Sequence, residues 1–218
     1  NFPKRKILYT NLVENLRYGE NPHQIGAFYS QNIENKLEQI HGKTLSYNNY
    51  SDIFAALTIS KSLPKNTGTA IVKHGNPCGV SALKNSFDSY KSALESDPIS
   101  AFGGIVSCNY KVSQKLAQML NKIFLEVVIA NGFDKKALEI LKLRKNVRLI
   151  DSSKITFNEI WKFNSADNFT LIQSEDRKIF SKKDFRIVSK KKPNKSQLDD
   201  LMFAFNVSRY TKSNAIVL

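Results

Sequence analysis

Lys73 and His74 stand side by side in segment 73–79, which reads Lys-His-Gly-Asn-Pro-Cys-Gly. The segment follows the apolar run 69–72, which predicts a buried strand, and it precedes residues 81–96, whose apolar side chains recur at helical spacing. A cation can stabilise negative charge and an imidazole can transfer a proton. Ligands of open α/β sheets collect at strand ends, so this segment is the first candidate for a site.

The glycines and the Asn-Pro pair of segment 73–79 predict a tight turn with close backbone approach. We expect this turn to lead from the strand directly into the helix 81–96. A loop histidine without a function is the competing interpretation. The adjacent lysine and the density of glycine and proline favour a functional loop.

A zinc site is the first chemical alternative, because zinc deaminases use the patterns H-x-E and P-C-x-x-C. Asn76 stands where the glutamate is required, and Ser81 stands where the second cysteine is required. We therefore predict no metal and no zinc at His74 and Cys78. The phosphate-loop lysine motif, the dinucleotide glycine motif and G-x-S-x-G are also absent from the sequence. The remaining chemistry is metal-free proton transfer on an anionic substrate.

A second polar segment, 16–24, reads Leu-Arg-Tyr-Gly-Glu-Asn-Pro-His-Gln and predicts a loop. The guanidinium of Arg17 suits a phosphate or a carboxylate, and the hydroxyl of Tyr18 adds a donor. An ordinary polar surface loop is the competing interpretation.

Strands and helices alternate along the first 150 residues, which predicts an α/β fold: a layered mixed sheet with flanking helices. A helix capped by Ser51 or Asp52 is expected to run to about residue 63. Segment 37–42 is expected to be a short connection. The other strands are expected at 6–9, 26–29, 69–72, 105–106, 127–130 and 147–150, and the other helices at 81–96, 112–124 and 134–143.

The last third of the chain is less regular. Strands are expected at 169–172 and 185–188, and an amphipathic helix at 194–211 leads into a strand that begins at Lys212. We therefore expect a core subdomain at about 1–150, an irregular segment and connector at 151–193, and a helix and strand at 194–218. Since the chain starts without methionine, we expect it to be part of a longer protein.

The 218 residues carry a formal net charge of +14, which raises the alternative of a nucleic-acid-binding module. The lysines are scattered and no recognition motif accompanies them, so we predict no nucleic-acid partner. A positive field would instead attract phosphorylated or polyanionic small substrates. No apolar run of about 18 residues is present, so we predict no membrane partner. The two cysteines, Cys78 and Cys108, suit a reducing cytoplasm, and we predict a cytoplasmic location.

Four segments together carry a resemblance to a known family: 16–24, 73–79, 97–104 and 212–217. In this order they resemble the transformylase domain of the bifunctional purine-biosynthesis enzymes, which combine phosphoribosylaminoimidazolecarboxamide formyltransferase with IMP cyclohydrolase. The resemblance covers nearly the whole chain. It implies a fold similar to the cytidine deaminases, with two related subdomains, and a homodimer with sites between subunits. It also implies that the cyclohydrolase domain and the second half of the transformylase domain are absent from this chain.

The resemblance implies transfer of a formyl group from 10-formyltetrahydrofolate, a co-substrate, to the 5-amino group of 5-aminoimidazole-4-carboxamide ribonucleotide (AICAR). No tightly bound cofactor is implied. By resemblance His74 transfers the proton, and Lys73 stabilises the oxyanion or helps to protonate the leaving nitrogen. Asn214 matches the residue that orients the substrate and the histidine.

The resemblance also implies the substrate-binding residues. Arg17 and Tyr18 match the clamp on the nucleotide phosphate. The positions that match the lining of the nucleotide pocket are Asn49, Phe102 and Gly103, and Glu126 aligns with an acidic residue of the folate side.

Two departures from the family pattern stand out: Asn131 replaces a usual proline, and the usual pair of glycines is missing near 168–173. A deaminase-like or cyclohydrolase enzyme acting on purine nucleotides remains the alternative within enzymes.

Overall fold

The computed structural model describes residues 2–32, 37–156 and 161–218. The chain forms two compact units, unit 1 (Asn1–Ile155) and unit 2 (Thr156–Leu218), and each is described by itself. The boundaries expected at residues 150 and 193 stay predictions. Within the described ranges, no helix is both long and apolar enough to cross a membrane.

Unit 1 is built on a six-stranded mixed sheet with the strand order β3-β8-β7-β6-β4-β5. Strands β6, β7 and β8 are parallel, whereas β3, β4 and β5 join their neighbours antiparallel. The strands are β3 (Glu38–His41), β4 (Gly68–Lys73), β5 (Asn76–Ala82), β6 (Ile105–Cys108), β7 (Val127–Ala130) and β8 (Arg148–Asp151). The predicted mixed α/β fold is therefore confirmed.

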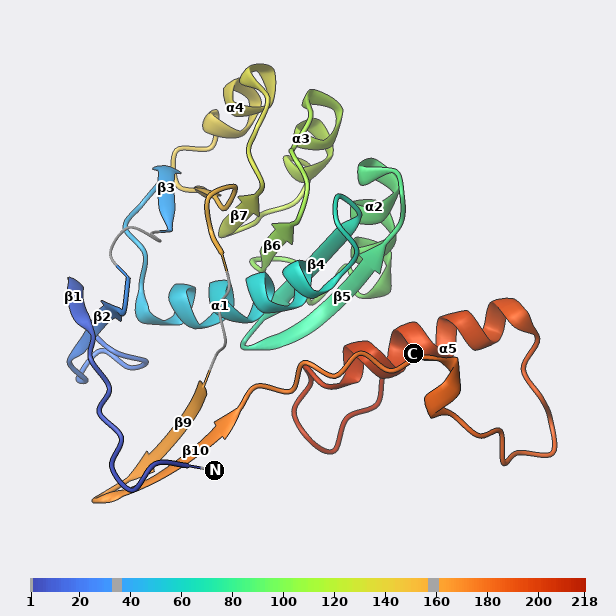
Figure 1. The fold of residues 1–218 in the computed structure, drawn as a ribbon. Coiled ribbons are helices and arrows are strands. Elements are labelled where there is room, and N and C mark those ends of the chain that lie inside the picture. The colour runs from blue at the N-terminus through green and yellow to red at the C-terminus, as the bar shows by residue number, and fades with distance from the viewer. Residues whose placement is uncertain (1, 33–36, 157–160) are drawn as a thin grey trace. The chain divides into compact units, whose positions relative to one another are not determined.

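Helices cover both faces of this sheet (Figure 1). On one face lies α1 (Tyr47–Ser62), and on the other lie α2 (Ser86–Ser96), α3 (Gln114–Leu120) and α4 (Lys135–Lys142). Successive strand side chains point to opposite faces, so Ser107 bonds Ser60 of α1 while Val106 joins the core under the other helices. Burial on both faces makes every residue of β6 and β7 inaccessible to water.

Side-chain caps set the starts of three helices in unit 1. Ser46 and Asn49 form a reciprocal capping box at the start of α1. Asn85 accepts hydrogen bonds from two backbone N–H groups at the start of α2, and Ser113 caps α3. The cap of α1 at Ser46, rather than at Ser51 or Asp52, corrects the predicted start of that helix.

The largest correction concerns the expected helix 81–96. Strand β5 takes up residues 76–82, and α2 begins only at Ser86. Lys73 pairs with Asn76 across a two-residue turn, so segment 73–79 is the tip of a β-hairpin and not a strand-to-helix turn. Residues 76–82 pair with β4 in this hairpin, and the helical spacing of the apolar residues in the sequence does not indicate that pairing.

Smaller corrections apply elsewhere in the chain. Residues 6–9 are not a strand, and β1 (Asn11–Leu16) pairs instead with β2 (Gly26–Ser30). The expected connection 37–42 contains strand β3. Neither 185–188 nor the residues after Lys212 form a strand.

Unit 2 contains a two-stranded hairpin and a helix. Strands β9 (Trp161–Ala166) and β10 (Phe169–Ser174) pair antiparallel, and a short 3-10 helix η1 (Lys182–Asp184) precedes α5 (Lys195–Ser208). Asn194 caps α5 with a capping box. Among its described residues, Val207 is the one buried hydrophobic side chain of unit 2.

Candidate active site

The turn between β4 and β5 presents Lys73 and His74. His74 and Gly75 have φ angles of 53° and 72°, the positive values that a two-residue type I′ turn requires at both central positions. The carboxylate of Asp52 in α1 accepts hydrogen bonds from the backbone N–H of His74 (3.2 Å) and of Gly75 (2.6 Å). His74 is exposed, so its imidazole can reach a ligand.

The ammonium of Lys73 bonds the loop that precedes β6. It donates a hydrogen bond of 2.7 Å to the carbonyl oxygen of Phe102. Gly103 has a φ of 74°, and a Cβ placed on it would lie 4.0 Å from the Lys73 Nζ. The rings of Phe102 and Phe124 are 5.5 Å apart. The predicted residues Lys73, Phe102 and Gly103 therefore lie together.

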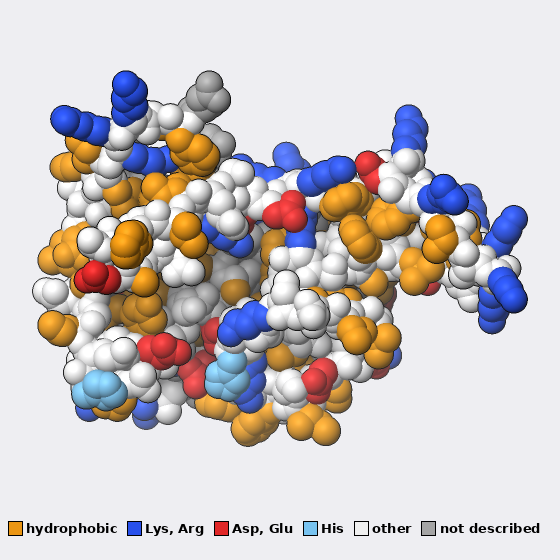
Figure 2. Space-filling model, turned by 90° about the horizontal axis from the view of Figure 1, so that it is seen from below, with side chains coloured by type: hydrophobic (Ala, Val, Ile, Leu, Met, Phe, Trp, Pro, Cys, Tyr) orange, Lys and Arg blue, Asp and Glu red, His pale blue; other side chains and the backbone are white. Residues whose placement is uncertain are grey.

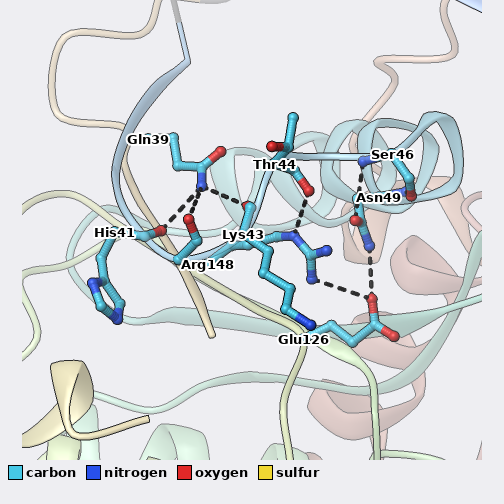
Figure 3. Close-up of polar contacts among 9 residues, drawn as sticks. Gln39, His41, Lys43, Thr44, Ser46, Asn49, Glu126 and Arg148 are labelled. Atoms are coloured by element: carbon cyan, nitrogen blue, oxygen red, sulfur yellow. Dashed lines mark hydrogen bonds and ion pairs between the residues drawn. The ribbon is translucent and has the colours of Figure 1, made fainter. Parts of the chain in front are cut away.

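Glu126 lies at the same edge of the sheet, immediately before β7. Its Oε2 accepts a hydrogen bond of 2.8 Å from the Asn49 amide and lies 3.7 Å from Nη1 of Arg148 (Figure 3). The Arg148 side chain is only 15% exposed and also bonds the carbonyl of Thr44, whereas Glu126 is 42% exposed. Figure 3 also shows the Lys43 side chain pointing toward Glu126. Cationic and amide donors thus hold one oxygen of a carboxylate that water or a ligand can still reach.

Arg17 and Tyr18 occupy the loop between β1 and β2. Arg17 is exposed and its guanidinium lies 5.8 Å from the Tyr18 ring centroid. The loop is joined to α1 by a hydrogen bond from the Asn48 amide to the Glu20 carbonyl (3.2 Å).

The β1–β2 hairpin also packs on α1. The ring of Phe28 stacks on that of Tyr50 at 4.4 Å, and the Tyr50 hydroxyl donates to Glu14. Burial raises the pKa of Tyr50, and the hydrogen bond to Glu14 raises it further. The phenol therefore stays protonated and acts as the donor.

The first half of α1 is therefore the common support of the site. Asn48 bonds the 17–24 loop, Asn49 bonds Glu126, and Asp52 bonds the His74 turn. The sequence indicates Asn49 as a site residue, but it does not indicate the supporting contacts of Asn48, Asp52 and Arg148. The spacing Ser46-x-x-Asn49 is a capping pattern, and it would have placed Asn49 and Asp52 on one helix face.

The edge of the sheet that carries these residues is not the one expected. Lys73 is the last residue of β4, but β4 runs antiparallel to β6. The register of Val72 with Ile105, and of Ile105 with Val127, places Lys73 beside the amino ends of the parallel strands. The site therefore does not lie at the carboxyl ends of the parallel strands, where open α/β sheets usually bind ligands.

Cys78 and Cys108 serve the interior of unit 1. Cys78 packs against the core, and Cys108 is part of it. Burial raises the pKa of the Cys78 thiol, and it raises the pKa of Cys108 to about 12, so both favour the neutral form over a reactive thiolate. In residues 2–32, 37–156 and 161–218, no group of three or more His, Cys, Asp or Glu side chains could hold a metal ion.

Asn214 belongs to unit 2, where it is exposed. Its part in the site stays a prediction, as do the individual roles of the other predicted residues.

A family model described as AICARFT/IMPCHase bienzyme matches residues 1–218. The "Bifunctional purine biosynthesis protein PurH" of Caldicellulosiruptor saccharolyticus is 41% identical over 226 residues, covering 100% of this chain and 44% of the relative. The protein of the same name from Caldicellulosiruptor bescii is 42% identical over 229 residues, with the same coverage. The chain thus spans less than half the length of these relatives.

Among solved structures, the apo form of a dCMP deaminase from the cyanophage S-TIM5 matches with a TM-score of 0.34 and 14% sequence identity. The match covers 44% of this chain and 91% of the deaminase. At this TM-score the likeness carries no argument.

Proposed function

The chain belongs to the AICARFT/IMPCHase bienzyme family, and from this premise we propose that it forms part of a purine-biosynthesis enzyme that transfers a formyl group. The donor is 10-formyltetrahydrofolate and the acceptor is the 5-amino group of AICAR. The observation that carries the proposal is that the first half of α1 bonds both Glu126 and the turn of His74, the residue next to Lys73.

Proton transfer is the central difficulty of this reaction. The 5-amino group is conjugated with the imidazole ring and is a weak nucleophile, so it needs a base as it attacks the formyl carbon. His74, exposed at the tip of its turn, takes the proton that the amine loses as the new C–N bond forms. The resulting tetrahedral intermediate carries a negative oxygen.

Lys73 supplies positive charge to the same place. Its ammonium stabilises the oxyanion, and it helps to deliver a proton to N10 of the folate when the C–N10 bond breaks. The products are the formylated nucleotide and tetrahydrofolate. The hydrogen bond to the Phe102 carbonyl holds the ammonium at the sheet edge while it keeps its remaining N–H donors.

Substrate binding uses the residues that surround this pair. Arg17 and Tyr18 bind the nucleotide phosphate, and Glu126 accepts a hydrogen bond on the folate side of the pocket. A Cβ on Gly103 would lie 3.6 Å from the Phe124 ring and 4.0 Å from the Lys73 ammonium, so the glycine leaves this space to a ligand. Asn49 orients Glu126, and Phe102 offers an exposed ring to the nucleotide.

The proposal includes no tightly bound cofactor and no zinc, with 10-formyltetrahydrofolate as co-substrate. The partners are AICAR, the reduced folate and a second copy of the protein, and Asn214 orients the substrate and His74. Cyclohydrolase activity is assigned to the part of the relatives that lies outside this chain.

The test is a formyl-transfer assay on the complete protein with AICAR and 10-formyltetrahydrofolate. We expect His74→Ala to lower kcat by about 10²- to 10⁴-fold, the usual contribution of a proton-transfer residue, with AICAR binding retained. His41→Ala is the control, because the described hydrogen bond of the His41 imidazole is to the Arg144 carbonyl, outside the site.

Full turnover by His74→Ala would contradict the role of His74. Bound zinc in the active protein, with hydrolysis of a purine nucleotide and no formyl transfer, would favour the deaminase-like alternative. Salt-sensitive retention on DNA or RNA without folate binding would favour the nucleic-acid-binding alternative.

A further inference from the structure

Asp52 lies beneath the turn that carries His74. Its Oδ2 accepts from the backbone N–H of His74 at 3.2 Å, and its Oδ1 accepts from the backbone N–H of Gly75 at 2.6 Å. Each carboxylate oxygen therefore holds one residue of the turn. None of the catalytic steps proposed above uses this side chain.

The geometry of the contact favours a carboxylate, because each N–H of the turn bonds a different oxygen of Asp52. Two neighbouring N–H donors point at Asp52, and an ionised carboxylate offers two acceptor oxygens. An asparagine has a single acceptor oxygen, so the two N–H groups would have to share it, and its N–H₂ group would take the place of the second acceptor. The left-handed conformation of His74 is uncommon for a residue with a side chain, and the two bonds hold it there.

The helix that carries Asp52 is itself held firmly. Ile53 and Leu57 of α1 are fully buried, and Asn49, one turn before Asp52, bonds Glu126. One helix face thus fixes the His74 turn at one point and the Glu126 carboxylate at another. A displacement of the turn would move the imidazole relative to Glu126 and to the Lys73 ammonium.

We infer that Asp52 is a positioning residue, which holds the His74–Gly75 backbone so that the imidazole meets the amine of the substrate. The inference rests on the proposed formyl transfer for its catalytic consequence. The contact between Asp52 and the turn does not depend on that reaction.

The catalytic test compares Asp52→Asn with wild type in the complete protein. We expect kcat for formyl transfer to fall about 10- to 100-fold, the cost of a small misplacement of a reacting group, while KM for AICAR changes less than about threefold. Asp88→Asn is the matched control, because Asp88 is an exposed carboxylate on α2 whose side chain makes no hydrogen bond or ion pair within the described part of the chain. It should keep the wild-type kcat.

A double variant separates positioning from general support of the fold. If Asp52 acts through His74, then adding Asp52→Asn to His74→Ala lowers kcat no further. A further loss in the double variant, or a wild-type kcat in Asp52→Asn, overturns the inference.

Amide hydrogen exchange tests the turn without any activity. The N–H groups of His74 and Gly75 should exchange at least about tenfold faster in Asp52→Asn than in wild type, while amides of β7 keep their rates. Unchanged exchange at both amides overturns the inference. If the wild-type protein transfers no formyl group but the amides lose protection in Asp52→Asn, the proposed function fails and the structural role of Asp52 stands.

Discussion

In unit 1 every residue of β6 and β7 is buried, whereas in unit 2 no residue of β9 or β10 is. The difference does not come from composition, because β10 contains Phe169 and Leu171, which are 73% and 75% exposed. The central strands of unit 1 have helices on both faces. The hairpin of unit 2 has no such layers among the described residues of its unit. Apolar residues in a segment therefore predict that a strand forms. Whether that strand is buried depends on the helices or sheets that pack on its two faces.

The two units also differ in the bonds that hold them. Unit 2 relies on a small cluster of aromatic side chains, in which the rings of Phe180 and Phe185 meet the ring of Phe205 edge-on. Asn206 exchanges two hydrogen bonds with the backbone of Phe180. Exposed hydrophobic side chains remain on the face seen in Figure 2, where Lys and Arg side chains stand in several separate places.

The two units also differ in glycine content, because all nine glycines of the chain lie in unit 1. A Cβ on Gly79 would come within 1.8 Å of the Ala93 carbonyl, so α2 packs on β5 only because Gly79 has no side chain. The turn between β9 and β10 instead places Asp167 at a φ of 51°.

The largest effect is expected from Gly79→Ala. The new methyl group must push α2 away from β5, and we expect unfolding of unit 1 to become easier by roughly 4 kcal/mol or more, measured by urea denaturation. Gly75→Ala is the control, because its Cβ would meet no atom within 4 Å. Its positive φ alone should cost about 1–2 kcal/mol. Equal losses for both variants would show that close packing of α2 on β5 is not what requires Gly79.

A second pair of variants compares apolar truncation in the two units. Ile71 is fully buried in β4, so Ile71→Ala should lower the free energy of unfolding by about 2–5 kcal/mol. Leu171 is 75% exposed, so Leu171→Ala should change it by less than about 0.5 kcal/mol. Thermal and urea unfolding of the complete protein measure both. A large loss for Leu171→Ala would mean that this face of β10 is covered there, which would remove the contrast between the units.

The strands of unit 1 could be predicted because their apolar runs are short, continuous and bounded by polar residues. Segments 69–72 and 127–130 are found as strands β4 and β7, and Glu126 stands immediately before β7 as expected. A fully buried strand can be recognised from its short run of apolar residues alone, so its neighbouring strands need not be known.

The site was less predictable, because its contacts join elements far apart in sequence. Helical spacing after residue 81 suggested a helix, but pairing with β4 extends β5 to Ala82. Asp52 was seen only as a cap, since its partner at Gly75 is 23 residues away. The strand expected at 185–188 is not formed, and its residues have no neighbouring strand within unit 2 to pair with.

Alkaline pH should affect unit 1 through its buried thiol. Burial raises the pKa of Cys108 from an ordinary value of 9.0 to about 12, so the folded state keeps a proton that the unfolded state releases. Stability is therefore full below pH 9 and falls as the pH rises from 9 toward 12, by up to about 1.4 kcal/mol per pH unit for this one group. Cys108→Ala should reduce that slope in urea unfolding measured across the interval. An unchanged slope would mean that other buried groups cause the loss of stability at alkaline pH. Tyr90 and Tyr110 are such groups, because burial raises their pKa as well.

Acid pH should affect unit 2 locally, and this is the smallest effect expected. Hydrogen bonds from the backbone N–H and the hydroxyl of Ser181 hold the pKa of the Asp184 carboxyl below its ordinary value of 3.8. The support that Asp184 gives to the start of η1 is therefore present above pH 3.8 and is lost as the pH falls through the lowered pKa. The amide signal of Ser181, followed by NMR, should titrate below pH 3.8, and Ser181→Ala should move that midpoint upward because the hydroxyl donor is gone. The strands of unit 1 should show no matching change in their amide signals. A Ser181 midpoint at or above 3.8 in the wild-type protein would mean that the Asp184 carboxylate is not held by this cap at the start of η1.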